Sequence, residues 1–318
     1  MGRKWINGRN IVLSGCSTGI GRELCRQLVL KHGCNVMGIA RNEEKLKSLK
    51  AELGDKFSYR RFDIGDKEKW QEFANELETM NFNVDILINN AGMIQPFTAY
   101  VDLDDSQITK INKTNYESIL TSCKVMIPLI KKSSYGGIIN ISSASSILPV
   151  AGEAIYSSSK FAVSGFTYSL YQELRGYGIF VQCVMPGPVK TDLYKARASE
   201  GEKESKVKDN KVENIGLTAE RAAQKIIGAI KRRKSRLVLG LIAKMMDFGV
   251  RVAPRITYVC TAKMIKKFGQ GMVPSFAPIY AEQISKAEEI KALKKNRKNV
   301  TYSKKNCPKN EALINDKI

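Results

Sequence analysis

The sequence predicts an α/β protein built on a doubly wound parallel sheet. Between residue 11 and about residue 240, short runs rich in β-branched residues alternate with segments of helix length. Strands joined by helices form right-handed crossover units, and such units give a parallel sheet covered on both faces. A glycine-rich turn also follows the first of these runs, at the place where sheets of this class bind nucleotides.

The apolar runs predict seven strands. In chain order they are IVLSG, NVMGIA, FSYRRFDI, VDILINN, GGIINIS, FVQCVMPG and RLVLG. Residues 191–216 are polar and rich in Gly, Lys and Glu, so we expect a mobile loop there. A helix with the sequence TAERAAQKIIGAIKRR should follow that loop.

Composition divides the chain into three parts. We expect residues 1–240 to form a single sheet-based domain, residues 241–285 a helical cap, and residues 286–318 a basic tail that stays largely unfolded beyond a short helix. Pro254 should break the cap into two amphipathic helices. The cap could roof a substrate pocket and rest on a membrane, or pack only on the core or on a partner subunit.

The positive charge lies mainly in the C-terminal part. The net charge is +21, yet residues 1–189 carry 22 Lys and Arg against 18 Asp and Glu, whereas the remaining residues carry 30 against 13. Such an excess suits an anionic membrane surface, an acidic ligand or a nucleic acid, or serves solubility alone. The tail has few aromatic residues for base stacking, so we expect no nucleic-acid partner.

Several function classes are disfavoured. The seven cysteines are scattered, odd in number and without a C-x-x-C pair, which argues against a disulfide framework and a zinc site. His32 is the single histidine, so a Ser-His-Asp triad or a His-rich metal site has too few ligands. We expect no metal, no secretory signal and no membrane span. The expected location is the cytoplasm, with peripheral membrane contact through the basic C-terminal region, and the expected assembly a homo-oligomer.

Residues 14–21, SGCSTGIG, follow the first predicted strand and open a helix. Glycines at 15, 19 and 21 allow a tight turn and let a pyrophosphate approach the helix N-terminus. The spacing differs from G-x-G-x-x-G and lacks the Lys-Ser/Thr of a P-loop. A nucleotide site is therefore favoured over a simple strand-to-helix turn.

The end of the second predicted strand bears on the choice of cofactor. Ala40 and Arg41 stand where an acidic residue would bind the ribose 2′-hydroxyl of NAD(H). An arginine suits a 2′-phosphate instead, which indicates NADP(H). The alternative is an exposed arginine at the start of a helix.

Residues 156–160, YSSSK, place a tyrosine and a lysine one helical turn apart. Tyr156 and Lys160 therefore share a helix face. An ammonium group near a phenol favours the phenolate, so Tyr156 could donate or accept a proton at working pH. A solvated helix with a chance pair is the alternative.

Together these motifs resemble the short-chain dehydrogenase/reductase family over roughly residues 8–240. They are SGCSTGIG, Asp63-Ile64, NNAG at 89–92, Asn115 in KTNYESIL, NISS at 140–143, YSSSK and PGPVKT at 186–191. The resemblance implies a Rossmann fold and a catalytic tetrad of Asn115, Ser143, Tyr156 and Lys160. Ser143 is chosen among neighbouring serines because it stands thirteen residues before Tyr156, as the family pattern requires.

The resemblance also implies a role for each member of the tetrad. Tyr156 exchanges a proton with the substrate oxygen, and Ser143 holds that oxygen by a hydrogen bond. Lys160 assists Tyr156 and binds the nicotinamide ribose, while Asn115 positions a water that passes protons to solvent. The implied NADP(H) contacts are Gly15, Ser17, Thr18, Gly19, Ile20, Gly21, Arg41, Asp63, Ile64, Asn90, Ala91, Gly92, Tyr156, Lys160, Pro186, Gly187, Val189 and Thr191.

We therefore expect an NADP(H)-dependent oxidoreductase that transfers a hydride between nicotinamide and a carbonyl or secondary alcohol. The chain resembles ketosphinganine reductases and hydroxysteroid dehydrogenases, which implies a hydrophobic, lipid- or steroid-like substrate. The alternative is a non-catalytic nucleotide-binding scaffold or a nucleic-acid-associated protein on the same fold. The intact tetrad argues against that alternative.

Overall fold

The computed structural model describes residues 5–191 and 216–272, together with residues 286, 289, 290 and 293. The loop predicted for residues 191–216 lies outside this part of the chain apart from its two end residues. The tail predicted for residues 286–318 lies outside it as well, except for the four isolated positions.

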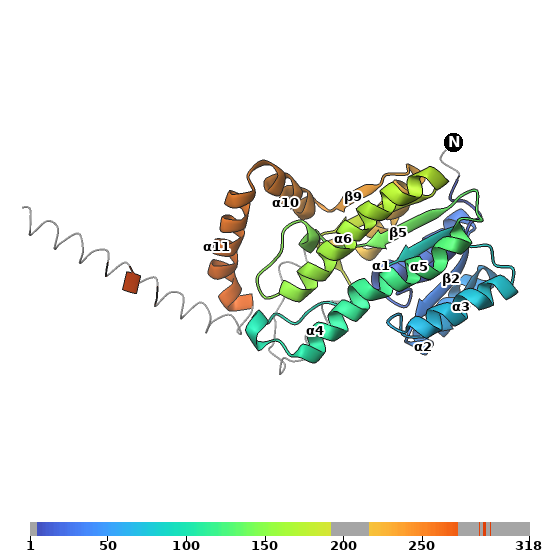
Figure 1. The fold of residues 1–318 in the computed structure, drawn as a ribbon, viewed down its shortest axis with the longest axis horizontal. Coiled ribbons are helices and arrows are strands. Elements are labelled where there is room, and N and C mark those ends of the chain that lie inside the picture. The colour runs from blue at the N-terminus through green and yellow to red at the C-terminus, as the bar shows by residue number, and fades with distance from the viewer. Residues whose placement is uncertain (1–4, 192–215, 273–285, 287–288, 291–292, 294–318) are drawn as a thin grey trace, which may run out of the picture.

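The seven predicted strands form one parallel sheet (Figure 1). Its strands are β1 (Asn10–Ser14), β2 (Asn35–Ala40), β3 (Phe57–Arg61), β4 (Ile86–Asn89), β5 (Gly137–Ile141), β6 (Phe180–Pro186) and β9 (Arg236–Leu239). The prediction for β3 extended to residue 64 and was too long. The strand ends at Arg61 because the Asp63 carboxylate accepts a hydrogen bond from the Gly65 backbone N–H at 2.9 Å and so forms a turn.

The strand order is β3-β2-β1-β4-β5-β6-β9, so the chain winds outward in both directions from the β1–β4 pair. In such sheets a crevice opens outside the carboxyl ends of the two central strands, and ligands bind there. A separate short parallel pair joins β7 (Val189–Lys190) to β8 (Leu217–Thr218).

Helices cover both faces of the sheet (Figure 1). Alternate residues of β1 show the two layers: Ile11 and Leu13 pack in one buried cluster, Val12 in the other. The first cluster includes side chains from α1 (Gly19–His32), α2 (Glu43–Leu53) and α9 (Ala219–Lys231). The second includes side chains from α3 (Lys67–Thr79), α5 (Ser118–Ile130) and α6 (Ala154–Leu174). Helix α4 (Asp105–Asn112) lies beside α6.

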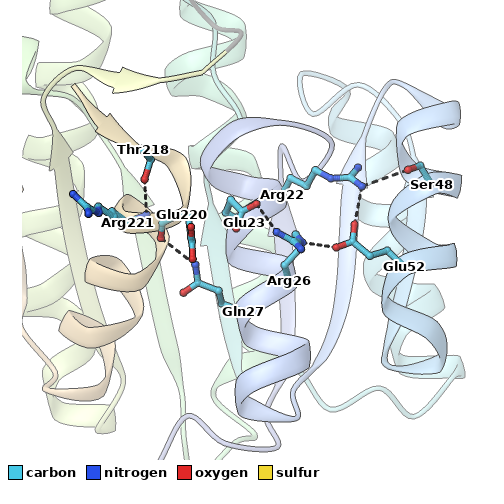
Figure 2. Close-up of polar contacts among 9 residues, drawn as sticks. All are labelled: Arg22, Glu23, Arg26, Gln27, Ser48, Glu52, Thr218, Glu220 and Arg221. Carbon is cyan, nitrogen blue, oxygen red and sulfur yellow. Dashed lines mark hydrogen bonds and ion pairs between the residues drawn. The ribbon is translucent and has the colours of Figure 1, made fainter. Parts of the chain in front are cut away.

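Polar contacts hold α1 from both sides (Figure 2). Arg22 and Arg26 of α1 both pair with Glu52 of α2, the first at 2.8 Å. On the other side Gln27 donates a hydrogen bond to the carbonyl of Glu220 in α9 at 3.0 Å. Exposed pairs of this kind are each worth about 1 kcal/mol or less. These contacts fix the position of α1, whose N-terminus faces the crevice.

Two further helices follow β9. A single residue, Ala253, separates helix α10 (Leu241–Val252) from helix α11 (Pro254–Met272), so the helical segment is broken at Pro254 as predicted. The guanidinium of Arg236 in β9 pairs with Asp247 at 2.9 Å and ties α10 to the sheet. None of the helices in the described ranges has an apolar stretch that could cross a bilayer.

Candidate active site

The glycine-rich turn after β1 meets the NNAG segment after β4 at the crevice. Gly15 has a φ of +71°, and a Cβ added to it would lie 2.6 Å from the Cα of Ala91. A Cβ on Gly21 would lie 2.0 Å from the Gly15 carbonyl oxygen. Both contacts are too close for any side chain, so only glycine allows this turn to fold against NNAG.

Hydrogen bonds fasten the two segments together. The Asn90 side-chain amide donates to the Gly15 carbonyl at 3.0 Å, and the Ala91 N–H donates to the Ser14 hydroxyl at 3.3 Å. Asn90 and Ala91 therefore brace the turn, whatever else they contact. Ser14 was missed by sequence reasoning because a serine at the end of a buried strand carries no signal of its own.

The N-terminus of α1 suits a pyrophosphate. Thr18 stands at the N-cap but makes no side-chain cap hydrogen bond, and the first turn holds no acidic residue. Ser17, Thr18, Gly19 and Ile20 are all partly exposed at this turn, and the Ile20 side chain also packs against the core. Free N–H groups and the helix dipole favour an anion here. This part of the site fits a dinucleotide cofactor.

The PGPVKT segment approaches the same turn from β6. Pro186 ends β6, and the Gly187 N–H donates to the Leu239 carbonyl at 2.8 Å. Val189 is buried in the core. Thr191 lies against the start of α1, where a Cβ on Gly19 would meet its Cγ2 at 3.0 Å. Of the four predicted residues, Thr191 is thus brought to the glycine-rich turn, while Val189 is mainly structural.

Arg41 and Asp63 line an open cleft of about 520 Å³. Their guanidinium and carboxylate groups are 3.5 Å apart, and 73% of the Arg41 side chain is exposed. Lys113 and Thr114 also line the cleft. Ile64, in contrast, is buried, and its carbonyl accepts a hydrogen bond from the Trp70 indole at 2.9 Å.

Tyr156 and Lys160 lie on α6, and both are buried. The Lys160 ammonium is 5.9 Å from the centroid of the Tyr156 ring and donates a hydrogen bond to the Ile141 carbonyl, at the end of β5, at 3.2 Å. Burial penalises the charged form and lowers the pKa of Lys160 to about 8. A lysine in this state can exchange a proton near neutral pH.

Asn115 and Gly92 complete the surroundings of Lys160. A Cβ on Gly92 would lie 3.2 Å from the Asn115 side-chain oxygen and 3.3 Å from the Lys160 nitrogen, so the three residues meet at one point. Asn115 sits in a π-helical turn, Lys113–Glu117, between α4 and α5. Turns of this kind are frequent at functional sites. Its amide donates to the Met93 carbonyl at 2.9 Å and to the Ser159 hydroxyl at 3.2 Å, which joins this turn to α6.

Ser143 lies in a tight turn just after β5. Its hydroxyl accepts a hydrogen bond from the Ser145 N–H at 3.0 Å. The preceding residue, Ser142, donates from its hydroxyl to the Lys160 carbonyl at 2.8 Å. The end of β5 therefore anchors both Ser143 and the helix that carries Tyr156 and Lys160.

Gln95 is a residue near the site that sequence reasoning missed. Helix α6 begins after Glu153, which makes no side-chain cap, and the Gln95 side-chain oxygen instead accepts from the N–H groups of Ile155 and Tyr156 at 3.0 and 3.1 Å. Its amide donates to the Gly152 carbonyl at 3.0 Å. Gln95 thus caps the catalytic helix from another loop, a contact that no short sequence motif reveals.

Among the described side chains, no group of three or more His, Cys, Asp or Glu residues could hold a metal ion. The geometry favours proton transfer at Tyr156, with Lys160 buried beside it, and dinucleotide binding along the crevice. Nicotinamide bound there would supply the hydride.

Comparisons with known proteins agree with this geometry. The family model described as short chain dehydrogenase matches residues 9–202. Dehydrogenase/reductase SDR family member 7B of Xenopus tropicalis is 33% identical over 268 residues, which are 81% of this chain and 85% of that protein. The human very-long-chain 3-oxoacyl-CoA reductase is 34% identical to this chain. The match covers 60% of this chain and 62% of that protein.

A solved structure supports the fold. The crystal structure of a short chain dehydrogenase from Burkholderia cenocepacia, in complex with NADP, has a TM-score of 0.67 and 22% sequence identity, and the match covers 80% of this chain and 98% of that one. The family match spans more than half of the present chain and contains the Tyr156 and Lys160 pair. This chain therefore belongs to the short-chain dehydrogenase/reductase family and is an NAD(P)-dependent oxidoreductase.

Proposed function

We propose that the protein is an NADP(H)-dependent carbonyl reductase, or in reverse an alcohol dehydrogenase, for a hydrophobic, lipid- or steroid-like substrate. The observation that carries the proposal is the buried Lys160 beside Tyr156, where Gly92 and Asn115 also converge. A scaffold without catalytic activity has no use for a buried lysine whose charged form is disfavoured.

Each residue of the tetrad has a task that its position supports. Tyr156 gives its hydroxyl proton to the substrate oxygen as the carbonyl is reduced. Ser143, on the turn after β5, holds that oxygen and stabilises its developing charge. Lys160, with a pKa of about 8, returns a proton toward Tyr156, and the Asn115 side-chain oxygen and the Lys160 ammonium both lie against Gly92. These roles need no metal ion.

The preference for NADP(H) rests on Arg41. Its guanidinium follows β2 at the cleft, in the place where an acidic residue would bind the ribose hydroxyl of NAD(H). Lys113 lines the same cleft and adds positive charge. A 2′-phosphate would compete for Arg41 with Asp63, which is already 3.5 Å away. The Burkholderia cenocepacia structure is a complex with NADP, which agrees with this preference.

A hydrophobic substrate is supported by the surroundings of Ser143. Ile147 and Met185 form a small buried cluster beyond the serine turn, and Val250 of α10 packs against it. Helix α10 also lies close to that turn. The name of the human relative describes reduction of a very-long-chain 3-oxoacyl-CoA, whose acyl chain is apolar. These features favour a carbonyl group carried on an apolar chain or ring system over a sugar or a short polar metabolite.

The test is a turnover screen that monitors NADPH oxidation. The panel holds ketosphinganine, ketosteroids, retinal and a long-chain 3-oxoacyl-CoA, with a short polar ketone as the hydrophilic comparison. We expect activity with at least one apolar carbonyl and none in the Tyr156→Phe variant, which serves as the background control. Turnover of the polar ketone alone would refute the substrate class, and no turnover of any carbonyl or alcohol would refute the proposed function.

A further inference from the structure

Helix α10 carries apolar side chains on two opposite sides. On the inner side Ala243 is fully buried, and Val250 packs against the small cluster near Ser143. The outer side exposes between 65% and 75% of each of four apolar residues: Leu241, Met245, Phe248 and Val252. At about 100° per residue, these four fall within one strip of about 60° along the helix. An amphipathic helix of a soluble protein normally places charged residues there.

Helix α11 presents polar residues to the protein and apolar residues to the outside. Thr257 lies against α10, because a Cβ on Gly249 would be 2.9 Å from the Thr257 hydroxyl. The Thr257 hydroxyl donates to the carbonyl of Ala253, just before α11, and the Thr261 hydroxyl donates to the carbonyl of Thr257. Meanwhile Ile256 is 66% and Val259 47% exposed. Figure 1 shows α11 at the edge of the molecule, outside the layers that cover the sheet.

Together these side chains form what we call the α10–α11 face. Its apolar members are Leu241, Met245, Phe248, Val252, Ile256 and Val259. Exposed apolar residues scattered singly need no explanation, but several of them on two adjacent helices indicate an interaction site. The question is what covers it.

The charges of the two helices are all positive on the outside. Lys244, Arg251, Arg255 and Lys263 are exposed. Asp247, the one acidic residue between positions 241 and 272, is turned inward: its side chain is only 18% exposed and pairs with Arg236 at 2.9 Å and with Arg251 at 3.1 Å. The face thus combines an apolar strip with cations and no outward-facing carboxylate among the described side chains.

This charge pattern decides between two occupants. A second copy of the chain, related by a two-fold axis, would bring the same face against itself. Lys244, Arg255 and Lys263 would then meet the same cations of the other copy, with no carboxylate of the two helices left to neutralise them because Asp247 is already paired, and such like-charge contact is unfavourable. An anionic bilayer offers both missing parts, negative headgroups for the cations and an apolar layer for the strip.

We propose that the α10–α11 face docks on the surface of an anionic phospholipid membrane, with Phe248 and its apolar neighbours entering the boundary between headgroups and acyl chains. The helices lie on the membrane and do not span it. The inference does not depend on the proposed substrate class. Lysines beyond residue 285 add attraction to anionic lipid, but they cannot produce a dependence on Phe248.

The experiment is vesicle sedimentation of the full chain at moderate salt. Vesicles of phosphatidylcholine mixed with phosphatidylglycerol are compared with vesicles of phosphatidylcholine alone. We expect the wild type to sediment with the anionic vesicles only. Phe248→Glu should weaken that binding by about tenfold or more, since it removes a large apolar side chain that would enter the bilayer and adds a negative charge. Leu30→Glu is the matched control, because Leu30 is 60% exposed on α1 and the added charge is the same.

A second pair of variants tests the cations. Arg255→Gln combined with Lys263→Gln should weaken binding about fivefold for each charge removed. The same two changes at Lys124 and Arg175, which are exposed elsewhere, remove equal charge and should have a smaller effect. Circular dichroism and cofactor binding confirm that each variant is folded.

Three outcomes would overturn the proposal. The wild type could fail to sediment with anionic vesicles. Phe248→Glu could bind as Leu30→Glu does, which would assign the attraction to charge elsewhere in the chain. Light scattering could instead show that Phe248→Glu dissociates a homo-oligomer without changing vesicle binding, and a second copy would then be the occupant.

Discussion

The two ends of the cofactor crevice each hold a cation, yet in opposite environments. Arg41 is 73% exposed at the side chain and lies beside a carboxylate, Asp63, at 3.5 Å. Lys160 is 4% exposed and donates to a backbone carbonyl at 3.2 Å. An arginine remains charged at any working pH, whereas burial brings the pKa of Lys160 to about 8. Exposure therefore supplies a permanent charge for binding, and burial supplies a group that can exchange a proton.

We therefore expect Arg41 to serve cofactor binding and Lys160 to serve the chemical step, and mutations can test each role separately. Changes at the buried end should alter the chemical step and leave cofactor affinity nearly intact when the lysine is kept. Changes at the exposed end should alter the choice and affinity of the cofactor and leave the chemical step intact.

The largest effect is expected for Tyr156→Phe. The change removes only the hydroxyl that transfers the proton, so turnover should fall on the order of 10³-fold, within the range typical of general acid–base catalysis. NADPH affinity should stay within about twofold, because Lys160 is unchanged. Steady-state rates and a fluorescence titration of NADPH measure the two quantities. A variant with near-normal turnover would remove Tyr156 from the proton-transfer role.

The second effect concerns folding stability and tests the burial of Lys160. The pKa of Lys160 is about 8 in the folded chain and about 10.4 in the unfolded chain. Between these two pH values the unfolded chain binds more protons than the folded chain, so the free energy of unfolding rises with pH. Well below pH 8, Lys160→Met should therefore be more stable than the wild type by on the order of 3 kcal/mol.

Denaturant unfolding at several pH values measures this prediction. The advantage of Lys160→Met should shrink between about pH 8 and pH 10.4, the window set by the folded and unfolded pKa values. Titrations of groups that do not interact with Lys160 are shared by both proteins and cancel in the difference, whereas Cys183, whose pKa the Lys160 charge lowers, makes a smaller contribution of its own. A stability difference that does not vary with pH would show that Lys160 is not desolvated in the folded state.

A smaller effect is expected at Gln95, which caps the helix that carries Tyr156 and Lys160. Gln95→Ala leaves the Ile155 and Tyr156 N–H groups without their acceptor, so the free energy of unfolding should fall by about 1–2 kcal/mol. Displacement of Tyr156 should lower kcat about tenfold while the KM for cofactor changes little. Gln172→Ala, at an exposed position of α6, is the control. An unchanged kcat would limit Gln95 to stability.

The sequence indicated the fold because each strand is buried on both faces and reads as an apolar run between helices. It also indicated the Tyr156 and Lys160 pair, since the two residues are one turn apart on a helix, whereas Asn115 and Ser143 were implied by the family resemblance. It could not reveal that Gln95 caps α6, or that Gly92, Asn115 and Lys160 converge, because these contacts join distant parts of the chain. The end of β3 was misjudged because the apolar pattern does not show the turn at Asp63, which a side-chain hydrogen bond from Gly65 and a backbone hydrogen bond from Asp66 close.

The sequence also did not reveal that one side of α10 exposes a strip of apolar residues. The apolar residues around positions 241–252 predicted a helix, but not which of them face the protein. Asp247 fixes that orientation by pairing with Arg236 of β9, and the strip is left outside as a result. A prediction of burial from hydrophobicity alone fails at such a place.

The most direct test of the different tasks of Arg41 and Lys160 compares the wild type with Arg41→Ala. The affinity of each protein for NADPH and for NADH is measured, together with kcat at saturating NADPH. We predict that the wild type prefers NADPH and that Arg41→Ala loses about tenfold or more in NADPH affinity, the value of a charge-assisted phosphate contact of about 1.5–3 kcal/mol. Its affinity for NADH and its kcat should not change. Equal affinity of the wild type for the two cofactors, or a kcat that falls with the Arg41 side chain, would contradict the account.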